Sequence, residues 1–82
     1  PNQRERLLAA FFYADEAGLT DEQAALVCNL LASCYWKRCG ELRQDGYIEF
    51  NGETRLGGSG LPRNVSVITR QGKHAAMKGD PL

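Results

Sequence analysis

Hydrophobic residues recur at helical spacing near the start of the chain. Leu7 and Phe11 form one i, i+4 pair, and Leu8 and Phe12 form a second pair beside it. Side chains four positions apart lie on the same side of a helix, so these four residues make a broad apolar face. The pattern predicts a helix over residues 2–17.

A second helix is predicted to begin at Thr20. The sequence Thr-Asp-Glu-Gln is a capping box, in which the Thr20 oxygen accepts the amide of Gln23 and the Gln23 side chain bonds back. Asn29 tolerates positive φ and is expected to form a sharp turn, which Leu30 fills. Leu19, just before this helix, is expected to enter the core in a very short strand. The residues of the helix expected to face the core are Ala24, Val27 and Cys28.

The stretch from Ser33 to Gly46 is predicted to form a third helix with two different faces. Ser33 is suited to cap its start, and Gly46 is suited to end it in the left-handed conformation. Tyr35, Cys39 and Leu42 share one apolar stripe. The opposite face is small, polar and basic, and consists of Ser33, Lys37, Gly40 and Gln44, with Trp36 at its edge. A face of this composition is suited to close approach by another molecule.

The hydrophobic period changes from 3.6 to 2 after the third helix. Ile48 and Phe50 alternate with polar neighbours, which predicts a strand with both side chains toward the core. Residues 51–64 contain four glycines and a proline, so they are expected to form a mobile loop. Residues 65–69 are expected to form the returning strand.

The end of the chain lacks a regular hydrophobic pattern. Residues 71–82 are polar and contain glycine, so they are expected to form a flexible tail with at most a helical turn near 74–77. Residues 1–70 are expected to form one domain, because 82 residues bury only a small core. No apolar run approaches the roughly 20 residues of a membrane span, so no membrane partner is expected.

The net charge of zero hides a difference between the two parts of the chain. Residues 1–30 carry a net charge of −3 and residues 31–82 a net charge of +3. A basic half suits a nucleic-acid partner. The three cysteines lack a secretory context, which predicts reduced thiols and a cytoplasmic location.

The order helix, helix, turn, helix, strand, glycine-rich loop, strand resembles the winged helix-turn-helix family over about residues 5–70. The motifs that carry the resemblance are Thr20–Ala25, Cys28–Leu30, Ser33 at the third helix, Glu41-Leu42 with Gly46 and Ile48, and the hairpin that follows. The stretches Gly52–Arg55 and Ser59-Gly60 are similar to the wing of small phage and actinobacterial members.

The resemblance implies an α+β winged helix that binds specific double-stranded DNA sequences. Its implied role is that of a transcriptional regulator, or of an accessory factor in recombination or replication, in a bacterial or phage-infected cell. The third helix would enter the major groove, and the wing would contact phosphates or the minor groove. One small domain gives modest affinity, so a homodimer or a protein partner is expected. The residues implied to bind DNA are Ser33, Trp36, Lys37, Arg38, Gly40, Arg43, Arg55 and Arg63.

Trp36 leaves three interpretations open. It can lie in the core, contact a sugar or a thymine methyl group, or anchor a protein partner. The last defines an alternative function, a winged-helix protein-interaction module that uses the third helix.

Catalysis, metals and cofactors have little support in the sequence. The only histidine, His74, lies in the expected tail, and no Ser/His/Asp set surrounds a core element. Cys28, Cys34 and Cys39 lack the CxxC spacing of structural zinc sites. No enzyme activity, metal or cofactor is expected.

Overall fold

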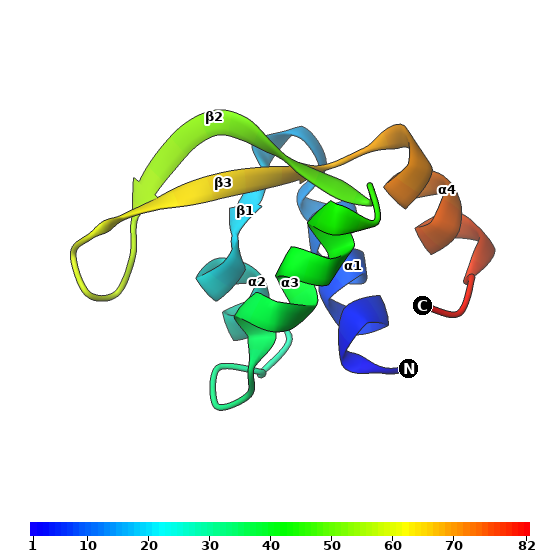
Figure 1. Cartoon of the computed structure of the whole chain (residues 1–82), viewed down its shortest axis with the longest axis horizontal. Helices are drawn as coiled ribbons and strands as arrows, with labels where there is room; N and C mark the ends of the chain where they lie inside the picture. The colour runs from blue at the N-terminus through cyan, green and yellow to red at the C-terminus, as the bar shows by residue number, and fades with distance from the viewer.

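The chain folds into four α-helices and a three-stranded sheet, and the computed structural model describes all of residues 1–82. The elements in order are α1 (Gln3–Ala14), the 3-10 turn η1 (Asp15–Ala17), β1 (Leu19–Thr20), α2 (Asp21–Val27), α3 (Tyr35–Gln44), β2 (Ile48–Leu56), β3 (Pro62–Ile68) and α4 (Arg70–Lys78). The sheet is antiparallel, in the order β1-β3-β2. The β2–β3 hairpin, hereafter the wing, extends from one end of the body, and α4 lies at the other (Figure 1). The predicted α+β winged helix is confirmed.

The signals at the start of α2, at the turn after it and at the end of α3 behave as the sequence predicts. The amide of Gln23 donates to the Thr20 oxygen at 3.1 Å, and the Thr20 amide donates to the Gln23 side chain at 3.0 Å. Asn29 has a φ of 57°, and Gly46 has a φ of 84° just after α3. These contacts and angles fix where α2 begins, where it turns and where α3 ends. None of the helices has the length and apolar character that crossing a membrane requires.

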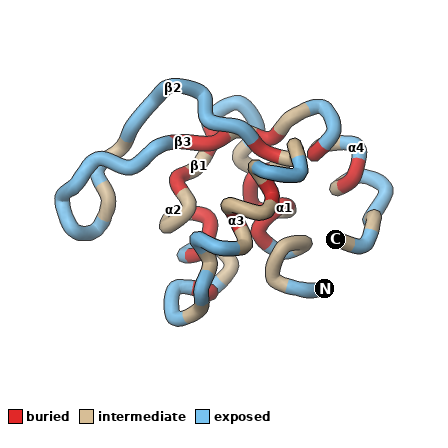
Figure 2. The backbone as a smooth tube through the Cα atoms, in the orientation of Figure 1, coloured by how far each residue is buried: buried red, intermediate tan, exposed pale blue.

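The core lies between α1, α3 and the inner end of the sheet, where the backbone in Figure 2 is buried. Its buried members are Leu7, Leu8, Ala10, Phe11, Ala24, Ala25, Leu30, Cys39, Leu42, Ile48, Ile68 and Ala75. Phe12, Leu19, Cys28 and Tyr35 pack against it with part of their surface exposed. The predicted apolar stripe of α3 is therefore confirmed.

Two residues that were expected in the core lie outside it. Val27 is largely exposed, because Ala24 and Ala25 fill the inward positions of α2 and the helix ends at Val27. Phe50 is also largely exposed, because β2 leaves the core directly after Ile48 and continues into the wing. The alternation around Phe50 is real, but there is no core beside it to receive the side chain.

The two strands of the wing are longer than the sequence indicates. Residues 51–56 and 62–64 were expected in a mobile loop, yet they are paired, with Thr54 opposite Asn64 and Arg55 opposite Arg63. A register shift between Phe50 and Thr54 absorbs Gly52, whose φ is 87°. The turn itself is confined to residues 57–61.

Residues 70–78 form helix α4, where a loose tail was expected. Thr69 caps it by accepting the amide of Gly72 at 3.0 Å, and Gly79 ends it in the left-handed conformation. Ala75 is buried, and α4 packs against α1. The helix is short of large apolar residues, so the hydrophobic pattern of the sequence does not reveal it.

Candidate nucleic-acid interface

One side of α3 is open to solvent along its length. Trp36 is 54% exposed, Lys37 and Gln44 are exposed, and a Cβ built on Gly40 would meet nothing within 4 Å. The Trp36 ring stands edge-on to Tyr35, with centroids 5.3 Å apart and planes at 83°. Tyr35 packs on the core, so one side of the Trp36 ring rests against a residue that is held in place, while its other side is exposed to solvent.

The start of α3 differs from the prediction. Ser33 was expected to cap the helix, but the N-cap position is Cys34, without a side-chain hydrogen bond. The Ser33 hydroxyl instead donates to the carbonyl of Leu30 at 2.7 Å. Ser33 therefore stabilises the turn before α3, and its hydroxyl is already hydrogen-bonded.

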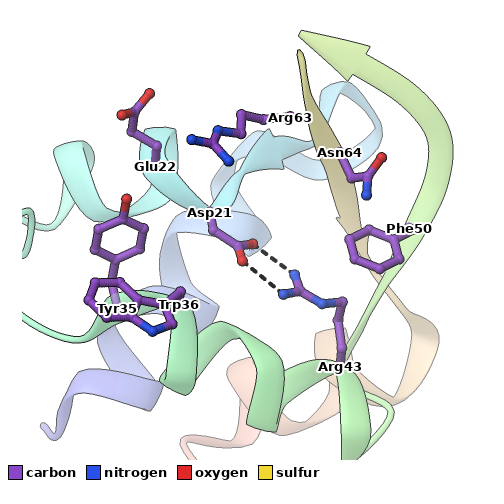
Figure 3. A pocket seen from close by; sticks show the side chains of 8 residues that line it. All are labelled: Asp21, Glu22, Tyr35, Trp36, Arg43, Phe50, Arg63 and Asn64. Carbon is purple, nitrogen blue, oxygen red and sulfur yellow. Dashed lines mark hydrogen bonds and ion pairs between the residues drawn. The ribbon is translucent and has the colours of Figure 1, made fainter. Parts of the chain in front are cut away.

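Arg43 connects α3 to three other elements. Its guanidinium donates twice to the Asp21 carboxylate, at 2.7 and 2.8 Å, and once to the Ser66 hydroxyl at 3.2 Å. Its central carbon lies 4.5 Å from the centre of the Phe50 ring, close enough for a cation–π interaction. The hydrogen bond to Asp21 is the main reason that the pKa of Arg43 is raised. Figure 3 shows the guanidinium of Arg43 pointing at the Asp21 carboxylate, with the Phe50 ring nearby.

Arg55 fixes the wing to the body of the protein. Its guanidinium donates to the carbonyls of Ala17 at 2.6 Å and Gly18 at 3.0 Å, and to the Gln23 side chain at 3.0 Å. All three acceptors belong to the body, so the contact sets the angle at which the wing leaves it. Arg55 was expected to contact DNA, but these acceptors already engage its guanidinium.

Few of the basic groups on this side of the protein are free. Arg38 forms an ion pair with Glu41 at 3.3 Å, and Glu41 also pairs with Arg4 at 3.3 Å. Lys37 and Arg63 are exposed and have no ion pair. These two carry the positive charge that is available to a phosphate.

A hollow of about 340 Å³ lies between α3 and the wing (Figure 3). It is lined by Asp21, Glu22, Tyr35, Trp36, Arg43, Phe50, Arg63 and Asn64. Three aromatic side chains face it together with two carboxylates and two guanidinium groups, so it is amphipathic and close to neutral. Its position makes α3 and the wing two sides of one surface.

The structure brings four of the eight predicted residues to this surface with their outer sides free: Trp36, Lys37, Gly40 and Arg63. The side chains of Ser33, Arg43 and Arg55 form hydrogen bonds within the protein. Arg38 forms an ion pair with Glu41. Asp21, Glu22 and Phe50 also line the surface but were not predicted to do so. Asp21 and Glu22 lie in the first turn of α2, far from α3 in the sequence, so no local pattern indicates that they line this surface.

The cysteines are not arranged as ligands. No group of three or more His, Cys, Asp or Glu side chains is close enough to hold a metal ion. All three thiols are free, and burial raises the pKa of Cys39 to about 12. Cys39 therefore stays protonated at neutral pH, and Cys34 is the one exposed cysteine.

The fold is that of a winged helix-turn-helix. The chain is similar to MepR of Staphylococcus aureus in a crystal structure of a MepR–DNA complex, with a TM-score of 0.71 and 14% identity over 96% of the chain. It is also similar to a structure of MepR described as a transcription regulator of the multidrug efflux pump MepA, with a TM-score of 0.69 and 14% identity over 94% of the chain. The chain spans 60% and 53% of the longer MepR chains in these two structures. No protein-family model and no curated protein matches the sequence.

Proposed function

We propose that this protein binds double-stranded DNA, with α3 in the major groove and the wing beside it. The observation that carries the proposal is the open side of α3, where Trp36 has a free outer surface, Lys37 is exposed and Gly40 has open space around it. Lysine pairs with guanine acceptors, and a glycine lets a helix approach the bases closely. A protein of the same fold, MepR, has been solved in complex with DNA, which supports DNA as the partner.

We infer a role in positioning, without chemistry. The two candidate roles are a sequence-specific transcriptional regulator and an accessory factor in recombination or replication. Free thiols suit the cytoplasm of a bacterial or phage-infected cell. One domain of this size gives modest affinity, so a homodimer or a protein partner would complete the site.

Replacing Lys37 with alanine should weaken DNA binding by about 1–3 kcal/mol, the usual value of one good base contact. Trp36→Ala should weaken it as well, through the loss of sugar or methyl contacts. The measurement is the binding of the parent protein and both variants to a pool of random 30-bp duplexes, at low and at physiological salt. A parent protein without DNA affinity even at low salt would rule the proposal out.

Arg63 and Arg55 form a matched pair for a second test, because they lie opposite each other in the wing. Arg63→Ala should reduce the salt dependence of binding by about one unit of slope, as the loss of one phosphate contact does. Arg55→Ala should weaken binding without changing that slope, because its guanidinium bonds to Ala17, Gly18 and Gln23. A reduced slope for Arg55→Ala would mean that the guanidinium leaves these carbonyls to contact phosphate.

The second candidate function is a protein-interaction module, and one observation favours it. Leu26, Val27, Leu31 and Trp36 are all largely exposed around the turn between α2 and α3, whereas few basic groups are free. In that case Trp36→Ala should cost at least about 2 kcal/mol of the protein association, as a buried aromatic anchor does. Lys37→Ala should then have little effect, which separates the two functions.

A further inference from the structure

The end of the wing is apolar and carries no charge. Residues 56–62, hereafter the wing tip, read Leu-Gly-Gly-Ser-Gly-Leu-Pro. Leu56 is 76% exposed and Leu61 is 58% exposed, although a turn on the surface of a protein is usually polar. Nothing in the chain covers either leucine, and the tip has no cation of its own with which to bind a phosphate.

The wing tip is also held rigidly. The amide of Gly57 donates to the Leu61 carbonyl at 2.8 Å, and the amide of Gly60 donates to the Gly57 carbonyl at 2.9 Å. The amide of Gly58 donates to the Glu22 carboxylate at 2.8 Å, which attaches the tip to the start of α2. These hydrogen bonds constrain the backbone between the two leucines, which lowers the entropy cost of ordering the tip against a partner.

The small size of the tip and the arginine beside it suit the minor groove of DNA. That groove is about 6 Å wide, and three glycines keep the tip thin. Proteins that bind there insert leucine or proline between base steps and hold the adjacent phosphates with basic residues. Arg63 follows the tip directly and is free, so it is placed to supply the phosphate contact.

We propose that the wing tip acts as an apolar wedge in the minor groove and kinks the DNA. The inference rests on the proposed function and extends it. Leu56 and Leu61 enter between two base pairs, while α3 lies in the neighbouring major groove. Pyrimidine–purine steps unstack easily, so the protein selects for such a step under the wing without a hydrogen bond to its bases.

The test uses a duplex that the protein itself selects. The parent protein is first used to enrich sequences from the pool of random 30-bp duplexes, and the dominant duplex is labelled with a dye pair at its two ends. A bend brings the two ends of the duplex closer together. Binding of the parent protein should therefore raise the fluorescence energy transfer between the two dyes by the amount expected for a bend of about 20–90°. Leu56→Ser combined with Leu61→Ser should bind about 10- to 100-fold more weakly, as burial of leucine side chains predicts, and should leave the saturated duplex straight.

Met77→Ser is the matched control, because Met77 is as exposed as Leu56 but lies on α4 at the far end of the molecule. It should bind and bend like the parent. Replacing the flexible pyrimidine–purine step of the duplex with an AA step should weaken DNA binding by the parent protein. It should leave DNA binding by the leucine double variant unchanged.

Two results overturn the inference, and they differ from each other. If the leucine variant binds and bends the duplex as the parent does, the wedge is wrong while DNA binding stands. If the parent protein binds no duplex of the pool even at low salt, DNA binding is wrong and the wedge falls with it.

Discussion

Replacing Gly72 with alanine should destabilise the fold by about 3 kcal/mol or more, at the upper end of the usual cost of overpacking. A Cβ at this position would lie 2.1 Å from the carbonyl oxygen of Tyr47 and 2.8 Å from a side-chain carbon of Ile68. The Tyr47 carbonyl cannot move aside freely, because it accepts hydrogen bonds from the amide and the hydroxyl of Thr69. Helix α4 would have to move away from β3, which is measurable as a lower urea midpoint.

Gly40→Ala is the control for this experiment. Gly40 also lies in a helix, but its surroundings are empty to 4 Å. The same substitution should therefore stabilise the fold by about 0.5–1 kcal/mol, the difference in helix propensity between the two residues. It would also place a methyl group on the open side of α3, so it should weaken DNA binding while strengthening the fold. Equal stabilities of the Gly72 and Gly40 variants would mean that α4 is loose in solution.

The sequence predicts the parts of the fold that are set by neighbouring residues. The capping box at Thr20, the turn at Asn29 and the apolar stripe of α3 each depend on residues within seven positions of each other. The length of the wing could not be predicted in this way. Most of β2 is exposed on both faces, so it lacks the alternation by which a strand is recognised.

Helix α4 was missed for a related physical reason. It attaches through a glycine and a small alanine, so large apolar residues do not mark its inner face. Thr69 and Gly79 bracket the helix as cap residues and were the signal that was available.

The candidate site was predictable only in part. The open side of α3 could be read from its unusual composition. The partners of Arg43 and Arg55 could not, because they lie at least 22 positions away in the chain. The local sequence shows that an arginine is present. Whether its guanidinium forms hydrogen bonds within the protein depends on residues that only the fold brings close. An arginine in a basic pattern therefore does not by itself indicate a phosphate contact, since Arg43 and Arg55 are engaged within the protein whereas Arg63 has no ion pair.

Removing the Arg43 side chain should be the second most damaging change. The side chains of Arg43 and Asp21 are only 18% and 23% exposed, so their paired hydrogen bonds are largely shielded from water. Loss of one partner of a buried pair typically costs about 3–5 kcal/mol, and the remaining exposure reduces this, so we expect about 2–4 kcal/mol for Arg43→Ala. The Ser66 hydroxyl, which is fully buried, would lose the guanidinium as its partner as well.

Arg43→Lys should be more stable than Arg43→Ala but less stable than the parent protein. An ammonium group keeps the charge but cannot form the paired contact with Asp21, nor lie flat on the Phe50 ring. The measurement is urea unfolding of Arg43→Ala, Arg43→Lys, Asp21→Asn and the double variant Asp21→Asn with Arg43→Ala. The double variant should be more stable than the sum of the two single losses implies, because it leaves no unpaired charge at the site. Additive losses would show that Arg43 contributes packing alone, and that the ion pair does not hold α3 against the start of α2.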